Sequence, residues 1–127
     1  MFEPKDAFSG FSVSDLAIAK EFYSDTLGLT AEDDDMGFSL DLPGGTTVFV
    51  YQKDNHLPAT FTILNFEVKD IDAAMDTLKA RGVRFEIYRD MPVDEKGILR
   101  GLSSNMGPDI AWFKDPAGNI LSILQES

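Results

Sequence analysis

Residues 66–83, FEVKDIDAAMDTLKARGV, have the pattern of a strand followed by a capped helix. Asp70 suits the N-cap of this helix, because its carboxylate can accept a backbone N–H that the first turn leaves without a partner. Gly82 suits the left-handed conformation in which many helices end. Between them, the apolar residues recur at the spacing of one helix face: Ile71, Ala74, Met75 and Leu78. The stretch therefore predicts a strand and an amphipathic helix that packs on a sheet.

The same order of elements occurs once more, in residues 11–29, FSVSDLAIAKEFYSDTLGL. Asp15 takes the place of Asp70, and Gly28 takes the place of Gly82 after the loss of one residue. The apolar face again has helical spacing, with Leu16, Ala19, Phe22, Tyr23 and Leu27. An internal repeat of this kind predicts two structurally similar halves.

The ends of the two halves also match. Residues 43–51, PGGTTVFVY, align with residues 116–124, PAGNILSIL, so that each half closes with a Pro-x-Gly turn and a short apolar strand. Apolar and β-branched residues also predict strands within LTAEDDD and GFSLDL of the first half and within VRFEIY and IAWFKD of the second. Each half is thus predicted to be βαβββ, and the fold class is α+β.

The predicted modules span residues 6–53 and 60–126 of a single domain. The second module is longer because of an insertion at about residues 89–108, which glycine and proline punctuate and which predicts a long loop or an extended hairpin. Arg89 and Arg100 flank or lie within this insertion, where a mobile loop could close over a ligand.

Composition limits the classes of partner. The chain has 127 residues, a net charge of −11 and no cysteine. An acidic surface disfavours nucleic acid and anionic membranes, and the absence of cysteine excludes disulfides and thiolate metal sites. The N-terminal residues lack the pattern of a signal peptide, so we expect a soluble cytoplasmic protein.

Two βαβββ modules, the helix sequence DLAIAKEFYSDTLGL and the closing WFKDPAGNILSIL together resemble the vicinal oxygen chelate superfamily, which includes glyoxalase I, extradiol dioxygenases, fosfomycin-resistance enzymes and bleomycin-binding proteins. The resemblance covers nearly the whole chain. It implies that the two modules pair into a half-open barrel around a small-molecule cavity, often in a homodimer.

The resemblance also identifies four places where family enzymes carry metal ligands. One of these is two residues after the Asn of a Gly-Asn-x-x-Glu ending, where this chain has Ser122. The internal repeat and the opening strands give the other three as Phe8, Phe49 and Ile63. Three apolar side chains and one hydroxyl cannot replace the hydration shell of a divalent cation, so we expect neither a metal nor another cofactor.

Strand alternation places further residues on the predicted cavity face. Asn65 and Glu67 alternate with the same parity as Ile63 and are the polar residues of this predicted face. Glu67 is also a weak catalytic candidate. The complete predicted ligand-binding set is Phe8, Phe49, Tyr51, Phe61, Ile63, Asn65, Glu67, Arg100, Trp112 and Ser122. The only histidine, His56, is interpreted as a solvated residue of the segment that joins the modules.

These observations predict a protein that binds a small organic molecule. The acidic surface and Glu67 are compatible with a cationic or aromatic ligand. Two alternatives stay open. One is a metal-dependent lyase, isomerase or dioxygenase of the same superfamily, and the other is a non-catalytic regulatory or interaction module.

Overall fold

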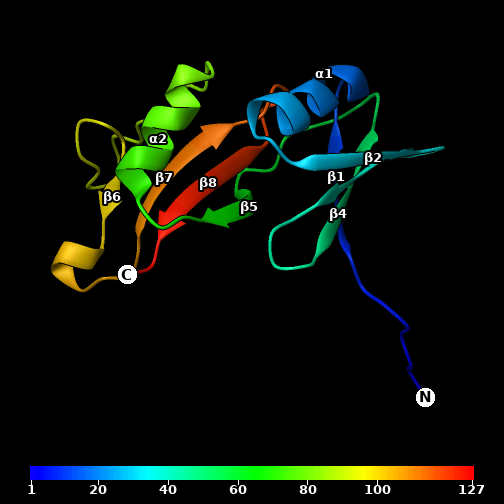
Figure 1. Ribbon diagram of the computed structural model, residues 1–127, viewed down its shortest axis with the longest axis horizontal. Helices are drawn as coiled ribbons and strands as arrows, with labels where there is room; N and C mark the ends of the chain where they lie inside the picture. Colours follow the sequence, from blue (N-terminus) through cyan, green and yellow to red (C-terminus); the bar gives the residue numbers. More distant parts are fainter. The chain divides into compact units, whose positions relative to one another are not determined.

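A computed structural model describes all residues from 1 to 127. The chain divides into two compact units, Met1–Leu57 and Pro58–Ser127 (Figure 1). The predicted modules, 6–53 and 60–126, each lie within one unit. None of the helices has the length and apolar character needed to cross a membrane.

The first unit has the predicted βαβββ order. Its four strands form one sheet in the order β1-β4-β3-β2, in which β1 and β4 are parallel and the other neighbours are antiparallel. The elements are β1 (Ser9–Val13), α1 (Leu16–Glu21), η1 (Phe22–Thr26), β2 (Thr30–Asp34), β3 (Gly37–Asp41) and β4 (Thr47–Gln52).

The predicted helix of this unit begins as expected and then widens. The Asp15 carboxylate accepts the backbone N–H of Ile18 at 3.0 Å, which is the predicted N-cap. From Phe22 the helix continues as a π-helix, η1, closed by a bond from the Leu27 N–H to the Phe22 carbonyl. The helix buries Tyr23 on the sheet face that also carries Val13, Phe38, Leu40, Val48 and Val50.

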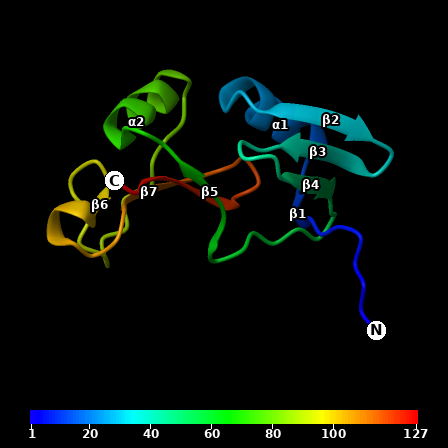
Figure 2. The same ribbon diagram turned by 60° about the horizontal axis from the view of Figure 1, so that its bottom comes forward.

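The second unit also has one four-stranded sheet, in the order β5-β8-β7-β6, with β5 parallel to β8 (Figure 1). Figure 2 shows α2 on one side of this sheet. The elements are β5 (Thr62–Glu67), α2 (Ile71–Ala80), β6 (Leu99–Arg100), η2 (Leu102–Ser104), β7 (Asp109–Lys114) and β8 (Ile120–Gln125). Asp70 caps α2 by accepting the Ala73 N–H at 3.1 Å, and Gly82 has φ +92°. The helix-side core is made by Ile71, Met75, Ala111, Phe113, Leu121 and Ile123.

One predicted strand, VRFEIY at residues 83–88, is wrong as a regular strand. Phe85 makes only an isolated antiparallel bridge with Phe113, next to a bond from the Glu86 N–H to the Trp112 carbonyl at 2.8 Å. The remaining length of the β7 edge pairs with β6, which the insertion supplies. The edge of β7 is therefore shared by two short segments, and neither forms a long ladder.

The insertion is a turn packed on the second unit rather than an open loop. The Asp94 carboxylate accepts the backbone N–H groups of Lys96 and Ile98, both at 2.9 Å, and holds the turn closed. A Cβ on Gly97 would be 2.5 Å from the Glu86 carbonyl oxygen, so only glycine allows the turn to pack this closely. Val93 and Leu99 then form a bridge, which gives the segment a short hairpin.

Candidate functional site

The face of the second sheet opposite α2 carries a group of polar and aromatic side chains. In register, Asn65 on β5 lies beside Ser122 on β8, and Ser122 lies beside Trp112 on β7. The residues that alternate with them pack beneath α2. Ser122 is fully buried and Trp112 is half-buried. The strand register thus brings together three of the residues predicted from sequence.

Hydrogen bonds fix these side chains in pairs. The Ser122 hydroxyl donates to the Asn65 side-chain oxygen at 2.5 Å, and the Trp112 indole N–H donates to the Thr62 hydroxyl oxygen at 3.2 Å. Ser122, at the place where the family ending has a carboxylate, is therefore engaged by a neutral partner. The orientations of Asn65 and the indole are set before any ligand arrives.

A β-bulge interrupts the simple alternation of side chains along β5. The register between β5 and β8 shifts between Thr62 and Leu64, so that Thr62 pairs with Ile120, on the same face as Ser122. The simple alternation that had assigned Ile63 to this face does not extend through the bulge. Thr62, not predicted from sequence, takes its place beside Trp112.

Tyr88 is a second residue that the sequence analysis missed. Its ring meets Trp112 edge to face, with 5.6 Å between ring centroids and 73° between planes. Its hydroxyl oxygen is buried and has no hydrogen-bond partner. Burial raises the pKa of Tyr88, and the negative charges of Glu86 and Asp90 raise it further. The phenol therefore stays protonated at neutral pH and can donate a hydrogen bond.

The face of the first sheet opposite α1 is also aromatic. Phe49 and Tyr51 stack with 6.0 Å between centroids and an interplanar angle of 17°. Ser12 lies beside Tyr51 in register, and its hydroxyl is 2.7 Å from Nδ1 of His56. His56 is half-buried and bonded, so its interpretation as a merely solvated linker residue was wrong.

Three other predicted residues lie at the ends of strands. Phe8 precedes β1 and Phe61 precedes β5, and their side chains are 69% and 67% exposed. Glu67 ends β5 in register with Leu124 and is exposed. Large apolar side chains this exposed are available to a ligand or a partner.

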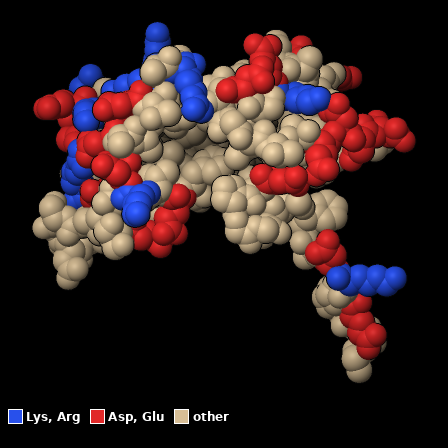
Figure 3. Space-filling view, viewed as in Figure 1, with Lys and Arg blue, Asp and Glu red and all other residues tan.

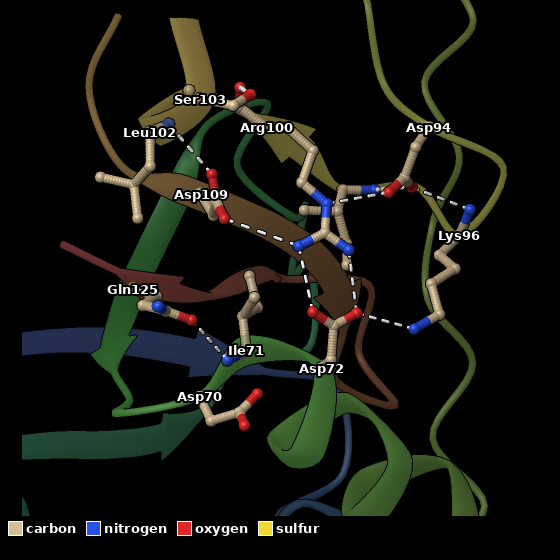
Figure 4. A network of polar contacts seen from close by, with 12 residues as sticks. Asp70, Ile71, Asp72, Asp94, Lys96, Arg100, Leu102, Ser103, Asp109 and Gln125 are labelled. Atoms are coloured by element: carbon tan, nitrogen blue, oxygen red, sulfur yellow. Dashed lines mark hydrogen bonds and ion pairs between the residues drawn. The ribbon is translucent and has the colours of Figure 1, made fainter. Parts of the chain in front are cut away.

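Arg100 does not share a face with Trp112. It pairs in register with Asp109, on the side of the sheet that α2 covers (Figure 4). Its guanidinium donates to both oxygens of Asp72, at 2.8 and 3.0 Å, and to Asp94 at 3.1 Å. These bonds lock the insertion to α2. Arg89, by contrast, is exposed at the start of the insertion.

The Arg100 cluster is strongly coupled electrostatically. Hydrogen bonds from Arg100 and then Lys96 hold the pKa of Asp72 well below its usual range. The bond with Asp72 raises the pKa of Arg100 in return. Burial alone would raise the pKa of Asp94, but the Ile98 N–H and Arg100 outweigh it and the pKa is lowered. The cluster is charged at all ordinary pH values and is well suited to a structural role.

The residues at the four family ligand places do not fit a divalent cation. Phe8, Phe49 and Ile63 offer only carbon, and the Ser122 hydroxyl is already bonded to Asn65. No group of three or more His, Asp or Glu side chains is arranged to hold a metal. Neither of these two sheet faces thus has the donor chemistry that the family metal requires.

The chain was compared with known proteins. Residues 8–123 match the family model of the Glyoxalase/Bleomycin resistance protein/Dioxygenase superfamily. No curated protein sequence matches the chain. Among solved structures, the fosfomycin resistance protein FosX from Listeria monocytogenes is similar, with a TM-score of 0.73 at 12% identity over 99% of this chain and 96% of that one.

Two further structures share the fold. A glyoxalase/bleomycin resistance protein/dioxygenase from Alicyclobacillus acidocaldarius has a TM-score of 0.71 at 19% identity, covering 99% of this chain and 95% of its own. The antibiotic binding protein TnmS3 from Streptomyces sp. CB03234 has a TM-score of 0.61 at 24% identity, covering 99% and 100%. With the family match over residues 8–123 and two βαβββ units, the chain belongs to the glyoxalase/bleomycin resistance/dioxygenase superfamily.

Proposed function

We propose that this protein binds a small organic molecule that contains an aromatic ring, and that it does so without the metal of the family enzymes. The observation that carries the proposal is the half-buried Trp112, held by Thr62 and bordered by Tyr88 on the sheet face opposite α2. Aromatic walls with a few fixed polar groups are the usual composition of a small-molecule site. The stacked Phe49 and Tyr51 give the first unit a second surface of the same kind.

The charge of the chain favours uncharged or cationic ligands. The net charge is −11, and Glu67 is an exposed carboxylate on the same sheet face as Ser122. A cation over an aromatic face gains electrostatic attraction from the ring, and an anion does not. Two relatives of similar fold are a fosfomycin resistance protein and an antibiotic binding protein, which supports sequestration or modification of a small molecule as the function class.

The metal-free part of the proposal is tested by metal analysis of purified protein, coupled to thermal-shift titration with Zn²⁺, Ni²⁺, Mn²⁺ and Fe²⁺. We expect no stoichiometric metal and no rise in the melting temperature, because a specific site stabilises the folded state in proportion to occupancy. One tightly held ion per chain, lost in Glu67→Ala, would instead favour a metal-dependent lyase, isomerase or dioxygenase. Glu32→Ala is the matched control, since it removes a carboxylate from the edge strand β2 of the other unit.

The ligand-binding part is tested by screening small aromatic compounds against ¹⁵N-labelled protein. The chain has one tryptophan, so the single indole N–H signal reports on Trp112 alone. Binding should move that signal in the wild type and in Met106→Ala, a control at an exposed residue of the second unit. In a Trp112→Phe, Tyr88→Ala double variant, which has no indole, the same compounds should leave the backbone amide signals unchanged. If no compound shifts the indole signal of the folded protein, the result would favour a regulatory or interaction module over a small-molecule binder.

The proposal includes a homodimer in the cytoplasm, with no nucleic-acid or membrane partner. The exposed Phe8 and Phe61 are the apolar side chains that an interface would cover. Light scattering after size exclusion measures the mass directly. A monomeric mass that Phe8→Ser leaves unchanged would remove the dimer from the proposal.

A further inference from the structure

We propose that the second unit binds a small anionic amphiphile, such as a medium-chain carboxylate, in a groove between the end of α2 and the insertion. The groove consists of two neighbouring cavities, of about 350 Å³ and about 440 Å³, whose linings share Ile87 and Glu95. Neither cavity is lined by Trp112, so this is a separate site, and the inference goes beyond the proposed function.

The first cavity is basic. Its lining includes Lys79, Arg84 and Lys96, with Glu95 as its one carboxylate. Lys79 and Arg84 are exposed, and neither forms an ion pair with another residue of the chain. Lys96 pairs with Asp72 at 2.7 Å, which offsets part of its charge. An anion in this cavity therefore meets two cations that are free to pair with it.

This positive charge is local to one part of an acidic chain. Between residues 79 and 100 lie six of the eleven basic residues and only four of the 22 acidic ones. The rest of the chain has five basic and eighteen acidic residues. Figure 3 shows basic side chains gathered over α2 and the segments beside it. Such an uneven distribution attracts small anions to this part of the surface, although the net charge of the protein repels them.

The carbonyl groups at the end of α2 oppose an anion less than an open helix end would. The Leu78 carbonyl accepts the N–H groups of Arg81 and Val83, and the Lys79 carbonyl accepts that of Gly82, all at 3.0 Å. The left-handed conformation of Gly82, with φ +92°, turns the chain so that these bonds can form. Because these two carbonyls are already paired, they present less negative charge to a ligand in the first cavity.

The second cavity supplies an apolar surface. Its apolar lining residues are Ile87, Met91 and Val93, and Ile87, which is 45% exposed, also lines the first cavity. Its charged lining residues are Arg89, Asp94 and Glu95. The Asp94 carboxylate is already bonded to two backbone N–H groups and to Arg100. The anionic head is thus best placed in the first cavity, with its apolar chain lying over Ile87 into the second.

The walls of the groove are fixed before a ligand arrives. The turn of the insertion packs so closely that a Cβ on Gly97 would be 3.3 Å from Cγ1 of Ile87. Lys96 and Arg100 both pair with Asp72, which holds this turn to α2. A preformed site loses little conformational entropy on binding, so modest ion pairing and apolar contact can give measurable affinity.

The experiment uses three probes with the same apolar chain on the full-length ¹⁵N-labelled protein: octanoate, octanamide and octylammonium. Dissociation constants are measured from the backbone amide signals of Gly82, Ile87 and Gly97. We expect octanoate to bind about threefold to tenfold more tightly than octanamide, as two partly exposed ion pairs would give, and octylammonium to bind most weakly. About 300 mM NaCl should reduce this preference, because exposed ion pairs are screened by salt.

The decisive variant is the double change Lys79→Gln, Arg84→Gln, which removes the two unpaired cations of the first cavity. The preference for octanoate over octanamide should disappear in this variant. It should persist in a Lys53→Gln, Lys69→Gln double variant, which removes the same charge from exposed lysines outside both cavities. All four side chains are exposed, so both variants should keep the fold.

Equal affinities of octanoate and octanamide for the wild type, or a preference that survives in the Lys79→Gln, Arg84→Gln variant, would overturn the inference. No shift of the groove signals by octanoate would overturn it as well. Octanoate shifts centred on the Trp112 indole would also overturn it, but they would support a ligand site on the sheet face. Conversely, failure of aromatic compounds to move the indole signal would count against the proposed function and leave the groove untouched.

Discussion

At the scale of single residues, the decisive feature is a neutral pair where a charged metal ligand would be expected. Ser122 is fully buried and is held by Asn65, whose own side chain is exposed. A carboxylate at position 122 would have to be desolvated without a cation opposite it, which is costly. The sheet is therefore arranged for an uncharged group at this place.

Ser122→Ala should lower the free energy of unfolding by about 1 kcal/mol, since it removes one buried hydrogen bond and lets the exposed Asn65 return to water. Urea denaturation followed by circular dichroism measures the change. Ser39→Ala, a half-buried serine on the first sheet, is the control and should change it by less than about 0.5 kcal/mol. Equal losses in both variants would show that the Ser122 bond contributes nothing specific.

Tyr88→Phe should not lower the free energy of unfolding, because the hydroxyl that it removes makes no bond within the chain. The expected change is within about 0.5 kcal/mol of zero, or a small gain, since an unsatisfied buried polar group is destabilising. The same urea titration measures it. A loss above about 1 kcal/mol would show that the hydroxyl is already satisfied in the free protein.

At the scale of elements, the helix caps and the apolar helix faces could be predicted from the sequence, whereas the strand pairing at the sheet edges could not. Asp15 and Asp70 act as predicted because an N-cap depends on local chemistry. The β5 bulge and the shared edge of β7 depend on partners far along the chain, which the sequence pattern does not identify. For the same reason Thr62 and Tyr88 were missed, although both contact Trp112, which the sequence analysis did place in the candidate site.

The two N-caps offer a direct test of this reasoning. Asp70→Ala and Asp15→Ala should each lower the free energy of unfolding by about 1 kcal/mol, because each leaves a backbone N–H of the first turn unpaired. Asp70→Asn and Asp15→Asn should retain most of the stability, since asparagine also caps well. Asp76→Ala, within α2 and exposed, is the control and should have little effect. Asparagine variants as unstable as the alanine ones would contradict the capping assignment.

The link between α2 and the insertion predicts a pH dependence. Because the pKa of Asp72 is lowered in the folded state, its stabilisation is complete above the ordinary aspartate pKa and is lost as the pH falls below it. The loss of stability caused by Asp72→Asn should therefore be greatest near pH 7 and shrink towards pH 3. The side chain is 44% exposed, so solvent screening limits the effect to about 1 kcal/mol.

Urea titrations at pH 7, 5 and 3 measure this difference. Asp54→Asn, an exposed carboxylate in the first unit, is the control and should change stability little at any of these values. If the stability difference between wild type and Asp72→Asn grew on acidification, the pH dependence would have the opposite sign. That result would contradict the assignment of Arg100 as the residue that holds the insertion to α2.

At the scale of the whole molecule, acidic side chains outnumber basic ones. The chain has 22 acidic and 11 basic residues, and Figure 3 shows acidic side chains gathered over β2. Four consecutive exposed acidic residues lie on and directly after β2: Glu32, Asp33, Asp34 and Asp35. A hydrogen bond with Asp41 of the neighbouring strand β3 raises the pKa of Glu32, as expected where carboxylates are crowded. Self-repulsion of this kind opposes the compact state.

Added salt should therefore stabilise the protein. Raising NaCl from about 10 mM to about 300 mM shortens the screening length from about 30 Å to below about 8 Å and weakens repulsion between carboxylates more than it weakens short ion pairs. A rise in melting temperature of about 2–4 °C is expected, measured by thermal unfolding in NaCl and in choline chloride. Equal effects of both salts would indicate screening, and an effect of Na⁺ alone would indicate site binding.

Glu32→Gln tests whether the stabilisation by salt arises from the carboxylates on β2 or from the charge of the whole surface. If crowding on β2 dominates, the variant should be more stable than wild type at low salt and should respond less to added NaCl, because one repelling carboxylate of the Glu32–Asp41 pair has been made neutral. If the repulsion is spread over the whole surface, removing one charge of −11 should leave the salt response almost unchanged. A melting temperature that falls with salt in both proteins would mean that ion pairs such as Arg100–Asp72 outweigh repulsion, and that the acidic surface does not destabilise the fold.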